Sequence, residues 1–476
     1  IILSMENQII INKELEKIFK YFHDKQYEKS EQLALIINQK YPDNISILKV
    51  LAEIFNKTGR KFDSINTYNN IIKLNSSDAQ SYFSLAGILS NSGNLKEAKF
   101  NYEKAIALRP DHAQAYNNLG SVYRKLGILN EAVNNYKKAL ILKFDYSLAY
   151  NNLAVIQQEI GNIKDSEINY LKAIKLEPNH KEIRLNLAIM LYFNHQYKKA
   201  VEHFKLIDSA QSNLYLLRCA YFQNEKLSFS NLLNLLIAKG ENNAVIGSFT
   251  KRASIRYGVK IPNPFCAKPL NYVFKKNLKE ICNFKNTFVE YVNTVLNSKD
   301  LSYRKQKLLT NGRQTSNDLF DQENTFISEI RKIIILEIEN YRNYYEKSEE
   351  GFIKNWPKFY KLTGWIVSMK NSGSLSAHMH DSGWLSGSIY INVPHKSKNN
   401  SGNLVVSTDY KEEEKNFIIK SKKSLSTLNE NKRQEKIIDV VTGDMCLFPS
   451  SLLHHTIPFE SSEERIVLAF DVIKSP

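Results

Sequence analysis

The chain has 476 residues, more than the roughly 250–300 at which a single hydrophobic core stops growing, so we expect two or more domains. Hydrophobic residues make up 43%, and no run of about 18 uncharged apolar residues occurs, which argues against a membrane-spanning helix. The net charge of +16 comes mostly from lysines spread along the chain, a distribution that argues against a nucleic-acid partner.

The N-terminal residues 1–7 have neither a basic segment nor an apolar stretch with a cleavage site, so they do not resemble a secretory signal. We therefore expect a cytoplasmic protein. Residues 1–13 precede the first repeat and are expected to form an N-terminal tail. The four cysteines form no CxxC pair, which is typical of reduced structural thiols rather than of a zinc knuckle or a disulfide framework.

A repeat of 34 residues fills the first half of the chain. At this spacing glycines, leucines and tyrosines align. The three series are Gly59, Gly93, Gly127 and Gly161, then Leu51, Leu85, Leu119, Leu153 and Leu187, and Tyr68, Tyr102, Tyr136 and Tyr170. Each glycine falls where the first helix of a pair should end, because a residue without Cβ makes a sharp turn at the least cost. His195 stands at this position in the last unit.

This pattern resembles tetratricopeptide (TPR) repeats over roughly residues 14–208. The resemblance implies helix pairs stacked into a superhelix, since one unit cannot bury its apolar face alone. In this class the concave surface usually receives a partner, so we expect a peptide or protein segment in the groove. Ahead of the leucine position stand amides that could clamp an extended backbone, namely Asn117, Asn118, Asn151 and Asn152.

The glycine register is lost after Asp208. Residues 209–262 keep an apolar periodicity as far as Ala238, which predicts a degenerate helical cap and a linker before a second domain at 263–476. Helical patterns follow at Leu278–Leu296 and Glu323–Tyr345, and we expect the polar segment Leu309–Phe320 between them to be a loop.

From Gly364 onward the pattern changes to short strands separated by turns. The expected strands are Trp365–Lys370, Leu385–Val393, Leu404–Thr408, Ile437–Val441, Asp444–Phe448 and Arg465–Val472. They predict an antiparallel jelly roll, or double-stranded β-helix, with flanking helices. The fold class expected for the whole chain is multidomain, with an N-terminal all-α TPR solenoid and a C-terminal jelly roll.

Histidines fall at the strand ends of this region. His378 and His380 are two residues apart, and on an extended chain such residues point to the same side, so both imidazoles can enter one cavity. His454 or His455 follows another strand and could complete a facial metal site. Solvent exposure or a hydrogen bond in the core is the simpler alternative for the pair His378 and His380.

Arg465 opens the last expected strand, eleven positions beyond His454. A guanidinium group at this place could bind the tail of a dicarboxylate with two parallel hydrogen bonds. The simpler alternative is a surface ion pair with the neighbouring Glu463 or Glu464.

Two segments, His378–Tyr390 and Gly443–Arg465, resemble the 2-oxoglutarate/iron(II) oxygenases that are often found behind TPR arrays. The resemblance is strongest over Gly364–Val472 and extends back to Asn263. It implies His378 and His454 as iron ligands, and it implies that Arg465 binds the distal carboxylate of 2-oxoglutarate.

This chain departs from the pattern at two positions. The wider superfamily has a carboxylate two residues after the first histidine, where this chain has His380. We expect His380 as the third ligand, with Asp381 as the alternative, and His455 as the alternative to His454. Val467 stands where a hydroxyl residue commonly supports the arginine, and Tyr390 or Ser388 could hydrogen-bond the cosubstrate.

The resemblance implies a dioxygenase that uses Fe(II), 2-oxoglutarate and dioxygen to hydroxylate an unactivated C–H bond. Combined with the array, it predicts a hydroxylase of a peptide or protein segment. Two alternatives stay open: a TPR scaffold or adaptor with a catalytically inactive jelly roll, and a three-histidine, cupin-like module that binds another metal or a sugar.

Overall fold

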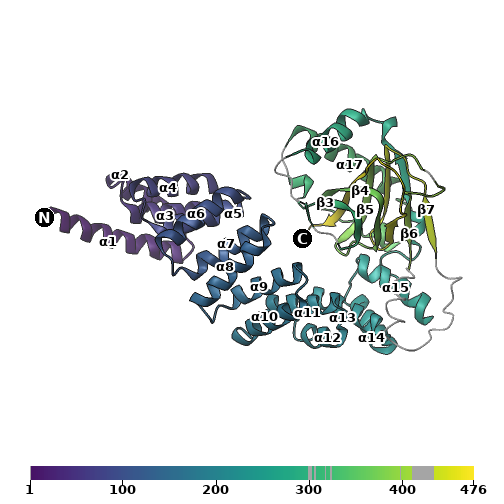
Figure 1. Ribbon diagram of the computed structural model, residues 1–476, viewed down its shortest axis with the longest axis horizontal. Helices are drawn as coiled ribbons and strands as arrows, with labels where there is room; N and C mark the ends of the chain where they lie inside the picture. Colours follow the sequence, from purple (N-terminus) through teal and green to yellow (C-terminus); the bar gives the residue numbers. More distant parts are fainter. Residues whose placement is uncertain are drawn as a thin grey trace. The chain divides into compact units, whose positions relative to one another are not determined.

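The computed structural model describes residues 2–298, 303–304, 307–316, 318–321, 324–396, 398–409 and 434–475, with side chains from Asn12 onward except that of Arg304. Two compact units, residues 1–203 and 204–476, make up the chain. Figure 1 traces the first in purple and blue and the second in teal to yellow. Among the described residues, no helix is long and apolar enough to cross a membrane.

The first unit consists of paired helices. Helix α1 begins at Ile2, within the segment expected to form a tail. The helices are α1 (Ile2–His23), α2 (Tyr27–Lys40), α3 (Ile45–Lys57), α4 (Lys61–Leu74), α5 (Ala79–Asn91), α6 (Leu95–Leu108), α7 (Ala113–Lys125), α8 (Leu129–Leu142), α9 (Ser147–Glu159), α10 (Ile163–Leu176), α11 (Lys181–Phe193) and α12 (Tyr197–Phe204).

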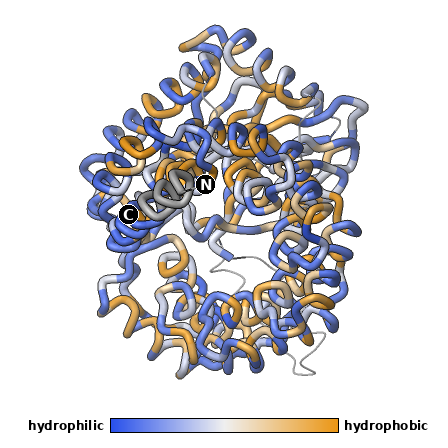
Figure 2. Tube along the Cα trace, turned by 90° about the vertical axis from the view of Figure 1, so that its left-hand side faces the viewer, coloured by the Kyte–Doolittle hydropathy of each residue, from blue (hydrophilic) through white to orange (hydrophobic). Residues whose placement is uncertain are grey.

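The repeated residues do what the pattern predicts. The four aligned glycines have φ between 77° and 92°, and His195 takes the same left-handed conformation with a φ of 59°. The aligned leucines and tyrosines are buried between helices. Ser64 stands at the repeat position that holds Ala98 and Ala132 in later units, and its hydroxyl donates to the Ala52 carbonyl at 2.7 Å. Figure 2 shows hydrophobic and hydrophilic residues alternating along these helices.

The second unit begins with three more helices, α13 (Ala210–Phe222), α14 (Lys226–Ala238) and α15 (Ala244–Tyr257). Their buried aromatic side chains, Tyr221, Phe229 and Phe249, pack into one cluster, against which Met379 of the jelly roll also lies. These three helices are therefore packed against the segment that carries two of the predicted site histidines.

Within the described residues, the strands form one curled antiparallel sheet in the order β1-β8-β5-β10-β4-β9-β6-β7, with β3 paired to β4 and β2 to β3. This sheet confirms the predicted jelly-roll architecture. The strands are β1 (Phe274–Asn277), β2 (Tyr303–Arg304), β3 (Leu309–Thr315), β4 (Tyr360–His378), β5 (Gly383–Asn392), β6 (Leu404–Ser407), β7 (Glu435–Ile438), β8 (Asp444–Pro449), β9 (Leu453–Thr456) and β10 (Arg465–Lys474).

Helices cover one face of the sheet (Figure 1), and the main core of the domain lies between them. Helix α17 buries Ile330, Ile334 and Ile338 against sheet residues such as Leu468 and Phe470. The helices of this layer are η1 (Pro269–Tyr272), η2 (Leu278–Glu280), the π-helix η3 (Lys285–Val289), α16 (Glu290–Leu296), η4 (Leu319–Asp321), α17 (Thr325–Tyr344) and α18 (Gly351–Lys354). The opposite face is left for the site.

The structure adds detail to two expectations about the middle of the chain. Leu278–Leu296 is helical in two parts, since η2 ends at Glu280 and η3 with α16 continues from Lys285 to Leu296. Leu309–Phe320 is not only a loop, because β3 pairs with β4. The side chains of β3 are mostly exposed, so this edge strand lacks the alternating apolar pattern by which strands are recognised.

Candidate metal centre

Three histidines meet on the inner face of the sheet. His378 ends β4, and His454 lies directly opposite it on β9. Their ring centroids are 4.3 Å apart, and the His380 ring lies 5.1 Å from His378 and 4.8 Å from His454. One nitrogen from each ring lies within 4.8 Å of the others, close enough for a single metal ion to bind all three.

Hydrogen bonds orient the rings. His378 Nδ1 lies 2.9 Å from the Ser376 carbonyl, and His380 Nδ1 lies 2.7 Å from Asp471 Oδ1. Both Nε2 atoms therefore face the centre, 3.2 Å apart. His454 Nδ1 is buried, and the part of the chain that the structure describes offers it no hydrogen-bond partner. A buried polar atom without a partner costs about 1–3 kcal/mol, which makes this donor set a good fit for a metal ion.

The electrostatics keep two of the imidazoles neutral. Burial, together with the neighbouring His380, lowers the pKa of His378 to about 4. Burial and the other two rings hold the pKa of His454 well below its usual value. Burial also acts to lower the pKa of His380, but the charge and hydrogen bond of Asp471 outweigh it, so this pKa is raised. Neutral imidazole is the form that binds a metal.

Two predicted alternatives lie outside the cluster. The side chain of Asp381 is 49% exposed and forms an ion pair with Arg218 of α13. His455 follows His454 on β9, and successive residues of a strand point to opposite faces. The structure thus brings together His378, His380 and His454, and it leaves Asp381 and His455 outside the group.

Arg465 is buried at the start of β10, with 2% of its surface exposed. Its Nε donates to the Gly402 carbonyl at 3.0 Å, and its guanidinium carbon lies 5.1 Å from the centre of the Tyr390 ring. Burial lowers the pKa of Arg465, an effect that Tyr390 partly offsets. No carboxylate in the described part of the chain forms an ion pair with it, and Glu464 instead bonds the Ser368 hydroxyl. This cation can therefore receive an anionic ligand.

The strand register connects Arg465 with the histidines. Residues at every second position share a face, so Ser386, Ser388 and Tyr390 of β5 lie on one side, opposite Asp471, Ala469 and Val467 of β10 in that order. Ser386 lies 3.3 Å from His380 Nδ1, whereas Tyr390 contacts Arg465. The predicted residue Ser388 therefore lies midway between the two ends of the site.

The middle of this row is less tightly covered than its ends. Ser388, Ala469 and Trp365 of β4 are half-buried, although most neighbouring residues on these strands are buried. Trp365 pairs with Ala469 in the ladder, and the centre of its indole lies 5.4 Å from that of the His380 ring. Ser388 and Ala469, which have small side chains, thus occupy the partly exposed middle of the row between the histidine cluster and Arg465.

Comparison with protein families agrees with this geometry. Residues 363–471 match the family described as "Putative 2OG-Fe(II) oxygenase". TPR families match residues 88–127, 120–161, 148–180 and 169–202. The N-terminal region thus contains TPR repeats, and the C-terminal region contains a segment that matches this oxygenase family. No match was found among curated proteins.

Several solved structures are similar to part of this chain. One described as MamA is 21% identical, covers 34% of this chain and 95% of its own, and has a TM-score of 0.32. Pseudomonas aeruginosa pilF is 19% identical, covers 44% and 97%, and has a TM-score of 0.38. A tetratricopeptide repeat protein from Parabacteroides merdae is 17% identical, covers 49% and 95%, and has a TM-score of 0.40.

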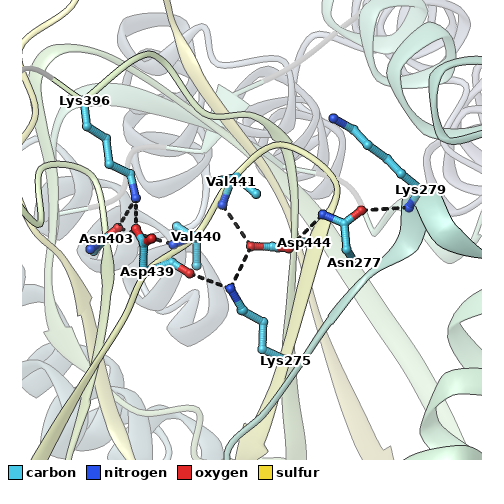
Figure 3. Close-up of polar contacts among 9 residues, drawn as sticks. All are labelled: Lys275, Asn277, Lys279, Lys396, Asn403, Asp439, Val440, Val441 and Asp444. Atoms are coloured by element: carbon cyan, nitrogen blue, oxygen red, sulfur yellow. Dashed lines mark hydrogen bonds and ion pairs between the residues drawn. The ribbon is translucent and has the colours of Figure 1, made fainter.

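A polar network links β1 to β8 and to the turn before it (Figure 3). Asp444 accepts hydrogen bonds from Asn277 Nδ2 at 3.0 Å and from the Val441 N–H at 2.9 Å. Lys275 donates to the Asp439 carbonyl at 2.9 Å, which ties β1 to the turn before β8. Gly443 in this turn donates to the Tyr390 carbonyl at 2.9 Å. The segment Gly443–Asp444 of the family signature thus holds the backbone next to Arg465.

Some residues of the site were missed by the sequence reasoning. They are Asp471 and Ser386 beside His380, Ser450 beside Ser386, Trp365, and Arg218 beside Asp381. A signal existed for Asp471, because it lies six residues after Arg465 on the same strand and therefore on the same face. No spacing in the sequence indicates Arg218, which reaches the site from a distant helix.

Proposed function

We propose that the oxygenase domain is a 2-oxoglutarate- and Fe(II)-dependent dioxygenase that hydroxylates an unactivated C–H bond. One observation carries this proposal: the cluster of three imidazoles contacts, through Asp471, the strand face that also carries the buried Arg465, for which the described residues offer no carboxylate partner. Imidazole suits Fe(II), and the distal carboxylate of the keto acid would neutralise the guanidinium.

In this proposal His378, His380 and His454 hold the metal. When bound, Fe(II) with 2-oxoglutarate and dioxygen supplies an oxidant that places one oxygen atom in the C–H bond, while the other oxygen leaves in succinate with release of carbon dioxide. Arg465 binds the distal carboxylate, and Tyr390 orients the guanidinium. Apolar residues packed around Tyr390, including Leu404, Val406 and Phe448, keep water from this end of the site.

A three-histidine module for another metal or a sugar is the competing function. It gives no reason to bury the Arg465 guanidinium away from every described carboxylate, since an uncompensated buried charge is costly. A site for a dicarboxylate gives that reason.

We further propose that the TPR array holds a peptide or protein segment as the substrate. The predicted amide clamps bond one another across repeats: Asn186 donates to Asn151 at 3.1 Å, and Asn152 donates to Asn117 at 2.9 Å. Asn151 in turn donates to Asn152 at 3.3 Å, which joins these bonds into one chain. Each amide has a second N–H and a second lone pair, which can pair with an extended backbone.

The metal site is tested by adding Fe(II) and then 2-oxoglutarate to the full chain without oxygen and recording the visible charge-transfer band of the chelated keto acid. We expect the band in wild type and in His455→Ala, and its loss in His454→Ala. With oxygen admitted, succinate should form in the first two proteins. No band in wild type with Fe(II) in excess would reject the oxygenase function and leave a scaffold as the better explanation.

The substrate proposal is tested with the full-length protein and a mixture of synthetic peptides, in which mass spectrometry detects the gain of one oxygen atom. We expect the double variant Asn151→Ala/Asn152→Ala to lower the yield of oxidised peptide several-fold and to leave the charge-transfer band unchanged. Equal yields from wild type and the double variant would show that these amides do not hold the substrate.

A further inference from the structure

Asp471 is a buried carboxylate at the rim of the histidine cluster. It lies on β10 with 5% of its surface exposed, and its Oδ1 is 2.7 Å from His380 Nδ1. The Ser386 hydroxyl donates to the same oxygen at 2.8 Å and lies 2.8 Å from the Ser450 hydroxyl. Asp471 is thus held by a hydrogen-bonded row that links β10, β5 and the end of β8.

The surrounding backbone allows this close packing only because residue 383 is glycine. A Cβ at Gly383 would lie 2.5 Å from Ser450 Oγ and 3.3 Å from Asp471 Oδ1. Any larger residue would therefore push the serine away from the row. The geometry around Asp471 is built by several residues and is not a chance contact of one side chain.

Charge explains why a carboxylate is needed there. Three neutral imidazoles around a divalent ion leave the full charge of +2 in a buried site, whereas a ligand set with one carboxylate leaves +1. Asp471 supplies this negative charge without binding the metal itself, because the ring of His380 lies between its carboxylate and the centre of the histidine cluster. A carboxylate on the outer nitrogen of a metal-bound imidazole also fixes which nitrogen faces the metal and makes it a stronger ligand.

Other acidic residues nearby are engaged elsewhere. Asp381 pairs with Arg218, and Asp444 bonds Asn277 and Lys275. Among the described carboxylates, Asp471 is the one within ion-pair distance of a cluster histidine.

We propose that Asp471 is a positioning residue of the metal centre, which replaces the coordinating carboxylate of the wider superfamily by acting on the metal through His380. This inference rests on the proposed function, since it takes the histidine cluster as a metal site. It predicts that removing one charge from Asp471 weakens metal binding far more than removing one charge from Asp381, although Asp381 is the next residue after His380.

The test is a titration of the full-length protein with Co(II), whose visible absorption reports its coordination. In Asp471→Asn we expect the dissociation constant for Co(II) to rise about 10–100-fold and the absorption spectrum to change. In Asp381→Asn, a matched loss of one carboxylate charge, we expect a change of about threefold or less, and Asp471→Glu should recover part of the affinity.

The outcomes separate the two proposals. If wild type does not bind Co(II), the metal site itself is rejected. If wild type binds Co(II) and Asp471→Asn binds it equally well, only the role of Asp471 is rejected. Should Asp471→Asn fail to fold by circular dichroism, Ser386→Ala takes its place, since it keeps the carboxylate but removes the hydroxyl that orients it. We then expect a several-fold loss of Co(II) affinity, and an unchanged affinity would overturn the inference.

Discussion

If Arg465 binds the distal carboxylate of the keto acid, the protein should distinguish 2-oxoglutarate from 2-oxovalerate, which has the same length but ends in a methyl group. The guanidinium is buried, its Nε is bonded to Gly402, and no described carboxylate competes for its other nitrogens. Two charge-assisted hydrogen bonds at about 1.5 kcal/mol or more each give about 3 kcal/mol. Since 1.4 kcal/mol is tenfold in affinity, wild type should prefer 2-oxoglutarate by about 100-fold.

The variant Arg465→Met removes the charge and keeps an unbranched apolar side chain. We expect it to bind 2-oxoglutarate about 100-fold more weakly and 2-oxovalerate almost unchanged, so that the preference falls to about one. The assay is an anaerobic titration of each keto acid into Fe(II)-loaded protein, followed by the charge-transfer band. If Arg465→Met weakens both keto acids equally, Arg465 only supports the structure and does not bind the distal carboxylate.

Three further predictions concern the titration of His378, the backbone at Gly443 and the ion pair of Arg218. The pKa of His378 is about 4 in the folded protein and near 6.5 in the unfolded chain, so the free energy of unfolding is highest above about pH 6.5 and falls as the pH approaches 4. The melting temperature of the metal-free protein should therefore drop between pH 7 and pH 5. It should drop less in His378→Asn. Gly443 has a φ of 101°, and a Cβ at this position would lie 2.9 Å from Lys279. In urea unfolding, Gly443→Ala should therefore lower the free energy of unfolding by about 1–3 kcal/mol, more than Gly240→Ala, where a Cβ would meet no atom within 4 Å. Equal losses in the two variants would rule out the contact with Lys279 as the cause. Loss of the ion pair with Asp381 in Arg218→Ala should lower the free energy of urea unfolding by about 0.5–1 kcal/mol, and Arg218→Lys should retain most of this stability.

The repeat array could be predicted in detail because its signals are local and periodic. The glycine at one fixed position per unit requires a left-handed turn, and the structure has one at each. The inner strands of the jelly roll were also predictable, since their buried residues form apolar runs. Strand β3 was not, because an edge strand is held by backbone hydrogen bonds and its side chains remain polar and exposed.

The histidines and Arg465 could be proposed as a site because a strand places every second residue on one face. What spacing does not provide is the partner of each group. The pairing of Arg218 with Asp381 joins residues 163 positions apart in the sequence, and that of His380 with Asp471 joins residues 91 apart. Such contacts depend on how helix α13 and strand β10 pack, which no local pattern contains.

The buried charges of the proposed site account for an all-histidine ligand set. In the protein alone, Arg465 contributes one positive charge and Asp471 one negative charge, so the two sum to zero. A divalent metal and the dianion 2-oxoglutarate add charges that also cancel, and the loaded site stays neutral. A site with a coordinating carboxylate and the same arginine has the same sum, with the negative charge one residue closer to the metal. Placing the negative charge on Asp471 and not on a metal ligand therefore keeps the net charge of the buried site at zero. The change affects chiefly how strongly the metal is bound.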